Sequence, residues 1–143
     1  MTTSATPGYG TLLKMGDGAS PTETFTTIAE VGDLEAPEIT LNTEDATSQD
    51  SGGWEEAIGT TLTGGEPSFE INWRPTNGTH DETTGMLYVI LNRVKKNWKL
   101  VLPNTAKTFS FAALVTGFKP KQPVAGKLTA EIKLKITGPV TVA

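Results

Sequence analysis

Apolar and polar residues alternate most regularly near the end of the chain, over residues 127–137. Strict alternation over eleven residues is typical of a strand with one buried face and one solvent-facing face. The side chains expected in the core are Leu128, Ala130, Ile132, Leu134 and Ile136, and those expected in solvent are Lys127, Thr129, Glu131, Lys133 and Lys135.

Shorter runs of the same kind predict further strands over residues 11–15, 24–31, 97–102 and 108–115. One helix is expected, because Thr79-His80-Asp81-Glu82 has the form of a capping box and apolar residues then recur at helical spacing from Met86 to Val94. Several half-buried strands and one helix predict a mainly β fold. We expect a β-sandwich or barrel of two packed sheets in a single domain, with the helix across one side.

Two alternating strands, Ile39–Asn42 and Glu66–Trp73, are separated by the long polar segment Thr43–Gly65. We expect them to pair as a hairpin and to point Ile39, Leu41, Phe69, Ile71 and Trp73 into the core. The segment between them has little beyond Trp54, Ala57-Ile58 and Leu62 to bury, so it cannot hold a shape by a core of its own. Loops of this length are uncommon and are usually functional or disordered. We therefore expect the segment to become ordered against another molecule.

The net charge of −4 hides an uneven distribution along the chain. Residues 1–72 carry thirteen carboxylates and one lysine (−12), whereas residues 73–143 carry eleven bases and three carboxylates (+8). Such a division suggests an acidic tail, a basic nucleic-acid face or complementary surfaces of a self-associating subunit. The alternative is an ordinary solvated surface with an uneven charge distribution. No dense Lys/Arg cluster with interleaved aromatics is present, which argues against direct nucleic-acid binding.

The residue types that carry catalysis or metal binding are scarce. There is no cysteine, and the single histidine, His80, is expected on the surface beside carboxylates. The segment from Asp45 to Glu56 has the length of a calcium loop, but its sixth position is Asp50 where glycine is required. We therefore expect no cofactor, no metal and no enzymatic activity. The sequence shows no signal peptide and no apolar run long enough to span a membrane.

The order of these elements, with one motif, resembles the major tail tube proteins of long, non-contractile-tailed bacteriophages. The motif is Gly-x-x-Ser-Phe-x-x-x-Trp-x-Pro from Gly65 to Pro75, after a loop that contains Asp50-Ser51-Gly52-Gly53-Trp54. An amphipathic helix and a last group of strands containing Gly117-Phe118 follow. The resemblance covers roughly Gly10 to Thr137. It implies hexameric rings that stack into a hollow tube through which DNA leaves the capsid. It also implies tape-measure, tail-terminator and distal-tail partners, with assembly in the host cytoplasm and a final place in the virion.

The resemblance assigns expected roles to parts of the chain. Residues 1–9 would form a flexible N-terminal arm, residues 43–65 an inter-ring loop, and residues 138–143 a C-terminal tail. The polar face of the expected hairpin carries no base and is expected to line the lumen, with Glu38, Thr40, Asn42, Ser68, Glu70 and Asn72. The loop is expected to contact neighbouring subunits through Trp54, Glu55, Glu56, Ile58 and Leu62; the alternative is that Trp54 folds back on its own subunit.

Two other functions remain open at this point. A tube subunit of a contractile tail or a secretion needle would share the fold and differ by binding a sheath, with the helix surface around Asp81, Arg93 and Lys96 as its docking face. A carbohydrate-binding β-sandwich would need exposed aromatic residues, and Trp73 and Trp98 are expected in the core, which leaves Trp54 alone.

Overall fold

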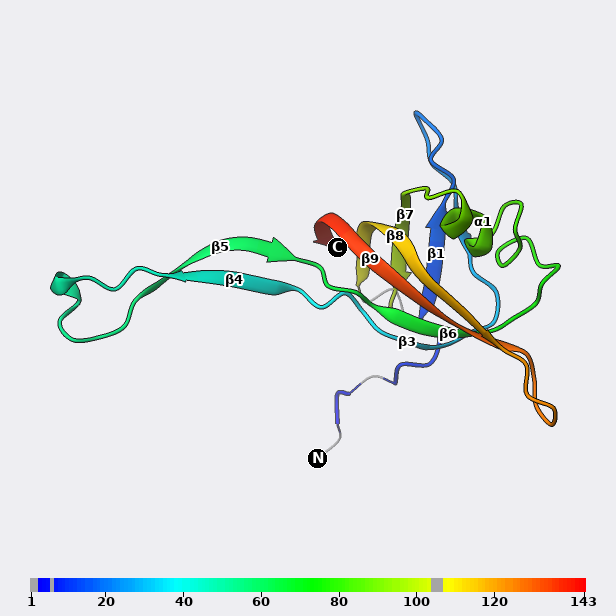
Figure 1. The fold of residues 1–143 in the computed structure, drawn as a ribbon, viewed down its shortest axis with the longest axis horizontal. Coiled ribbons are helices and arrows are strands. Elements are labelled where there is room, and N and C mark those ends of the chain that lie inside the picture. The colour runs from blue at the N-terminus through cyan, green and yellow to red at the C-terminus, as the bar shows by residue number, and fades with distance from the viewer. Residues whose placement is uncertain (1–2, 6, 104–106) are drawn as a thin grey trace.

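The computed structural model describes residues 3–5, 7–103 and 107–143. It consists of a β-rich body and a long arm that projects from it (Figure 1). The body is a seven-stranded antiparallel sheet in the order β2-β1-β7-β8-β9-β6-β3, and the arm is a separate two-stranded sheet, β4-β5. The body strands are β1 (Leu12–Gly16), β2 (Phe25–Thr27), β3 (Val31–Leu34), β6 (Ser68–Asn72), β7 (Lys96–Val101), β8 (Thr108–Lys121) and β9 (Thr129–Val142).

The connection between β2 and β3 forces the sheet to curl. These strands lie at opposite ends of the strand order, yet only Ile28–Glu30 separate them in sequence. The single strand expected over residues 24–31 is therefore two edge strands, with Ile28 buried between them and Glu30 at a positive φ of 53°. The two halves of the sheet face each other in a sandwich-like layer without closing into a barrel.

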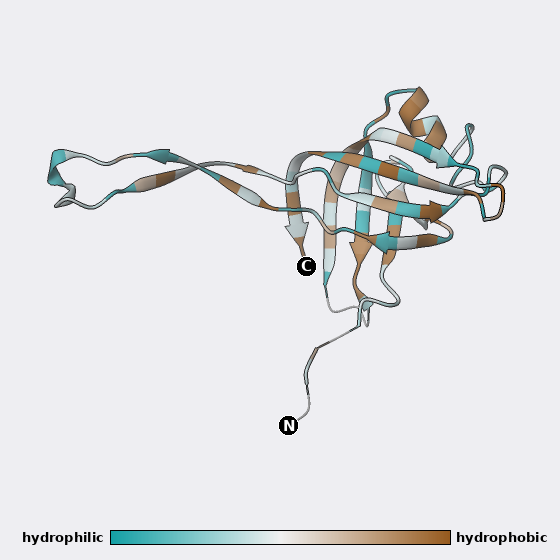
Figure 2. Cartoon of the chain, turned by 60° about the horizontal axis from the view of Figure 1, so that its bottom comes forward, coloured by the Kyte–Doolittle hydropathy of each residue, from teal (hydrophilic) through white to brown (hydrophobic). Residues whose placement is uncertain are grey.

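The concave face of the curled sheet holds the core, as the alternation predicts. Trp98, Ala113 and Ile132 are fully buried, and the predicted core residues Phe69 and Ile71 are buried with them. Trp73 packs against this cluster, edge-on to Phe118, with ring centroids 5.7 Å apart. Apolar positions recur along the body strands in Figure 2. The prediction of a mainly β fold is confirmed.

Strand β9 extends further than the sequence pattern indicates. It continues to Val142 and pairs with β8 in an antiparallel ladder, so residues 138–142, which were expected in a C-terminal tail, belong to the sheet. Thr108 and Ala143 close the ladder with two backbone hydrogen bonds, at 2.7 and 3.0 Å. The pattern fades there because Gly138 and Pro139 interrupt the alternation, whereas backbone pairing continues.

The helix is shorter than expected and begins differently. α1 spans Met86–Leu91, with Gly85 as its N-cap and no side-chain capping bond, so the predicted capping box at Thr79 is wrong. A Cβ at Gly85 would collide with the backbone nitrogen of Asp81, which explains the glycine. The Asp81 carboxylate accepts hydrogen bonds from the backbone N–H groups of Thr84 (2.9 Å) and Gly85 (3.0 Å), and these lower the pKa of Asp81. α1 buries Met86 and Val89 against the sheet.

His80 is fully buried, so its predicted surface position is wrong. Its Nε2 lies 2.8 Å from the carbonyl oxygen of Ala29, and its Nδ1 accepts the backbone N–H of Arg74 at 3.1 Å. A carbonyl can only accept, so these two bonds together require the neutral imidazole with its proton on Nε2. His80 thereby ties the β2–β3 connection to the segment that follows β6.

Candidate assembly surfaces

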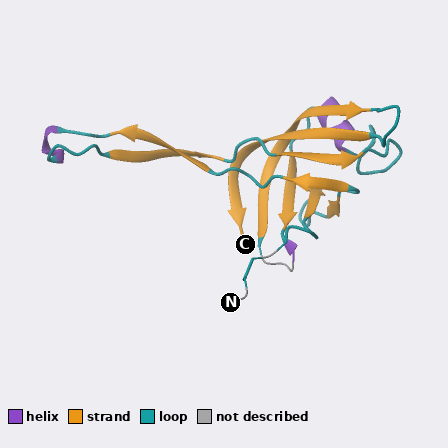
Figure 3. Ribbon diagram, turned by 90° about the horizontal axis from the view of Figure 1, so that it is seen from below, coloured by secondary structure: helices purple, strands orange, loops and turns teal. Residues whose placement is uncertain are grey.

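The segment between Ile39 and Gly65 is a hairpin arm and not an irregular loop. β4 (Thr40–Asp45) pairs with β5 (Ala57–Thr63), with a register shift between Leu41 and Thr43. β-Branched threonines occur in both strands and favour an extended conformation. The expected pairing of Ile39–Asn42 with Glu66–Trp73 is therefore wrong, because β6 pairs with β9 and β3 instead. In Figure 3 the two arm strands extend well beyond the body.

The tip of the arm is shaped by polar hydrogen bonds without a core. The Asp45 carboxylate accepts from the hydroxyl (2.6 Å) and the backbone N–H (2.9 Å) of Thr47, and these bonds lower the pKa of Asp45. Across the tip, Glu56 donates its N–H to the Thr47 hydroxyl and accepts the Ser51 hydroxyl at 2.8 Å. Gly52 and Gly53 turn the chain at positive φ before Trp54. Sequence reasoning missed this network, which replaces the core that the segment lacks.

Both arm strands are exposed along their whole length. Ile39 and Leu41, expected in the core, are 51% and 54% exposed, because β4 leaves the body. Leu41 and Leu62 face each other across the arm and form an apolar pair in solvent. Trp54 is 79% exposed, so it does not fold back onto its own subunit. Apolar side chains that stay uncovered in this way mark interaction sites.

The base of the arm is fixed to the body at Gly64 and Gly65. The carbonyls of Gly65 and Pro67 accept the backbone N–H groups of Ile136 (3.3 Å) and Leu134 (3.0 Å) on β9. A Cβ at Gly64 would lie 2.6 Å from a methyl group of Ile136, and Gly65 has a φ of 76°. Only glycine fits such a close approach and such a backbone conformation without strain. The two glycines between the alternating runs were the sequence signal for this break.

The open face of the body sheet carries half of the residues expected in the lumen. Ser68, Glu70 and Asn72 of β6 share this face with their β9 partners Lys133, Glu131 and Thr129. Glu38 instead lies at the arm base beside Gly65, and Thr40 and Asn42 belong to the arm. The expectation of a single base-free face does not hold, because Lys133 lies opposite Ser68 in the ladder.

Glu70 and Glu131 lie directly opposite each other on this open face. Like charges in that position destabilise a sheet. A basic side chain at either position would relieve the repulsion within the subunit. On its other side Glu131 lies opposite Lys119 of β8, so this row of the open face carries charges of both signs.

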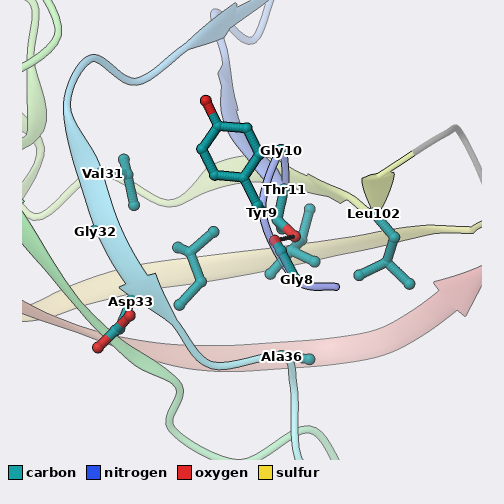
Figure 4. A pocket seen from close by; sticks show the side chains of 11 residues that line it. Gly8, Tyr9, Gly10, Thr11, Val31, Gly32, Asp33, Ala36 and Leu102 are labelled. Atoms are coloured by element: carbon teal, nitrogen blue, oxygen red, sulfur yellow. Dashed lines mark hydrogen bonds between the residues drawn. The ribbon is translucent and has the colours of Figure 1, made fainter. Parts of the chain in front are cut away.

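A cavity of about 840 Å³ lies between the segment Gly8–Thr11 and β3. It is lined mainly by glycines and aliphatic side chains, and Asp33 is its only carboxylate. Figure 4 shows the Tyr9 hydroxyl and the Asp33 carboxylate at opposite ends of the view, so they do not converge on one point. Within the described ranges no group of His, Asp and Glu side chains could hold a metal ion. No helix of the described chain is both long and apolar enough to cross a bilayer.

Comparison with protein families gives a match that covers nearly all of this architecture. The model of the lambda phage tail tube protein family matches residues 11–143, which include the body and the arm. The chain belongs to the lambda phage tail tube protein family. It is a tail tube protein and a component of the virion, and its family and structural neighbours are structural tail tube proteins.

Solved structures share the fold at low sequence identity. This tail tube protein is similar to a chain in the tail of an empty gene transfer agent particle with C6 symmetry (17% identity, TM-score 0.76, 97% of this chain and 99% of the other). It is also similar to a chain of the sheath–tube complex of an extracellular contractile injection system (16% identity, TM-score 0.69, 98% and 92%). None of the curated proteins compared with the chain matches it.

The fold alone does not separate contractile from non-contractile systems, because a chain of a contractile injection system shares it. The family match assigns the chain to the tail tube proteins of the lambda phage family. It also overrides the carbohydrate-binding alternative, in agreement with the buried position of Trp98.

Proposed function

We propose that six copies of this tail tube protein form a ring and that the rings stack into a hollow tube through which DNA leaves the capsid. The observation that carries the proposal is the family match over residues 11–143 together with an arm whose two strands no described part of the chain covers. The C6 symmetry of the similar gene transfer agent tail supports six subunits per ring. The chain acts as a structural subunit and not as a catalyst. The tube encloses a tape-measure protein and ends on terminator and distal-tail proteins, as expected for the family.

In this proposal the arm is the inter-ring contact. It brings Trp54, Glu55, Glu56, Ile58 and Leu62 to a subunit of the neighbouring ring. A large apolar area that is exposed in the subunit and buried in the assembly is the usual form of a binding hot spot. Ring formation would also cover the edges of the sheet. β3 is such an edge strand, since it is short and pairs only with β6 among the described strands. Exposed sheet edges of this kind invite association with other chains.

The open face of β6 and β9 lines the lumen in this proposal, with Ser68, Glu70 and Asn72 on its surface. Six copies of the opposed Glu70 and Glu131 would then form a ring of carboxylates around the channel, with Lys119 of β8 opposite Glu131 and Lys133 opposite Ser68 on the same face. Carboxylates on the channel wall repel phosphates and oppose the salt-dependent adhesion that lysine contacts cause.

Electron microscopy of the purified, concentrated protein tests the proposed assembly. We expect six-fold rings or hollow filaments with a central channel. A chain that stays monomeric at every concentration and salt condition, with Trp54 still exposed, would overturn the proposal.

The lumen assignment has its own test in Glu70→Lys. This change should stabilise the isolated subunit, because the lysine faces Glu131, and should slow DNA ejection from virions that carry it. Glu82→Lys, with the same charge change at an exposed position outside this face, should leave ejection unchanged. Equal ejection kinetics for both variants and the unmodified virion would contradict the lumen assignment.

A further inference from the structure

The two ends of the molecule differ in charge. The tip of the arm lies at one end of the longest axis, and the turn that joins β8 to β9 lies at the other (Figure 1). Residues 40–63 carry five carboxylates and no base. Residues 117–128 carry three lysines, Lys119, Lys121 and Lys127, and no carboxylate. Copies that repeat along this axis would therefore bring an acidic end against a basic end.

Each end also exposes apolar surface. Trp54 is 79% exposed at the arm tip, and Val124 is completely exposed in the β8–β9 turn. Pro120 and Pro123 flank Val124 on the basic end. Prolines and lysine stems offer flat aliphatic surface to an indole ring, and a lysine ammonium above the ring adds cation–π attraction.

Two lysines elsewhere in the chain are engaged within the subunit. Lys135 lies 3.7 Å from the Glu66 carboxylate, and Lys99 lies 4.2 Å from the centre of the Phe25 ring. In the ladder, Lys119 lies opposite Glu131, whereas Lys121 lies opposite the uncharged Thr129. The β8–β9 turn is therefore a basic surface at the end of the molecule away from the arm, and Lys121 on it faces no carboxylate in the ladder.

We propose that the arm tip of one subunit docks on the β8–β9 turn of a subunit in the next ring. This inference rests on the proposed function and adds the receiving surface to it. Trp54 packs against Val124 and the prolines beside it, while Asp50 and Glu55 face Lys121 and Lys127. Charges of opposite sign at the two ends steer successive rings together in one orientation. The contact is heterologous, since two different patches meet, and so it repeats along the tube without closing.

The absence of native cysteine makes the contact directly testable. The double variant Glu55→Cys/Val124→Cys is assembled into tubes and treated with a short bismaleimide cross-linker. We expect a ladder of covalent multimers on a denaturing gel, because each subunit then has one reactive site at each end of the contact. Each single variant should stay monomeric on the gel, because each contact then holds only one thiol, and Glu55→Cys/Lys95→Cys should give no ladder. Tubes without a ladder from the first variant, or an equal ladder from the Lys95 control, would overturn the proposal.

Charge reversal tests the electrostatic part of the contact. Lys121→Glu/Lys127→Glu and Asp50→Lys/Glu55→Lys should each raise the critical concentration for tube formation by tenfold or more. The combination of all four changes should restore it to within a few-fold of the unmodified chain. If the combined variant assembles no better than the two double variants, the pairing is wrong. If the unmodified chain itself forms no rings or tubes, the proposed function fails, which is a separate result.

Discussion

Replacement of Trp54 by alanine should weaken tube assembly strongly and leave the fold of the subunit unchanged. A tryptophan side chain offers roughly 200 Å² of surface, and 79% of this residue is exposed in the subunit. Burial of about 160 Å² at about 25 cal/mol per Å² corresponds to about 4 kcal/mol for each contact, an upper value because ordering the tip opposes it. With a lower bound of about 2 kcal/mol for a hot spot, the critical concentration should rise by about 30-fold to several hundred-fold.

The assay is sedimentation of tubes over a series of total protein concentrations, with the soluble plateau taken as the critical concentration. Urea unfolding of the subunit should change by less than about 0.5 kcal/mol, since the residue is exposed. Tyr9→Ala removes an aromatic residue that is 95% exposed outside the arm, and it serves as the matched control. An unchanged critical concentration for Trp54→Ala, or an equal rise for Tyr9→Ala, would refute the role of the arm tip.

Three further predictions concern the subunit itself. His80→Ala should lower the free energy of unfolding by about 3 kcal/mol, because it leaves two backbone groups without their hydrogen bonds to the imidazole. A loss below about 0.5 kcal/mol, measured by urea unfolding, would mean that the imidazole contributes little to stability. Hydrogen bonds from Thr84, Thr83 and Gly85 lower the pKa of Asp81 in the folded subunit. The ionised carboxylate therefore stabilises the fold at pH values above the ordinary Asp pKa, and this stabilisation is lost as the pH falls through the lowered pKa of the folded state. Asp81→Asn should therefore destabilise the subunit at neutral pH, and its unfolding curve should approach that of the unmodified chain below about pH 4, whereas a constant gap down to pH 2 would contradict this. Gly64→Ala should cost about 1–3 kcal/mol and reduce hydrogen-exchange protection of the Ile136 amide, while unchanged protection would show that the arm base is not tightly packed.

The sequence predicted those parts of the fold in which alternation and burial coincide. The alternation over residues 127–137 placed four of its five expected core residues correctly, because one face of the strand packs on the core and the other faces solvent. Leu128 is the exception: it lies just before β9 and is 41% exposed. The mainly β class followed from the same alternation. The family resemblance rested on the strand from Gly65 to Pro75, and the match over residues 11–143 agrees with it.

The predictions were wrong where the alternation of apolar and polar residues does not correspond to burial within the subunit, or where position depends on contacts between distant segments. Ile39 and Leu41 alternate with polar residues as a buried strand would, but they belong to an arm that finds no core within its own chain. The pairing of β6 with β9 depends on contacts between segments about 60 residues apart, which no local pattern encodes. His80 was misplaced because its two hydrogen-bond partners are backbone groups, whose positions depend on the finished fold.

The paired strands of the body lie far apart in sequence and those of the arm lie close together, and this difference has a consequence for the order of folding. The body needs β1 to find β7, with Leu13 opposite Leu100, before its core can close. The arm needs only β4 and β5, which are close neighbours in sequence. Distant pairings slow folding, and local hairpins form within microseconds. A newly made chain can therefore expose its apolar hairpin before the core of its body has formed. Rapid synthesis at high concentration should then favour disordered aggregates, whereas slow refolding from dilute solution should favour ordered tubes.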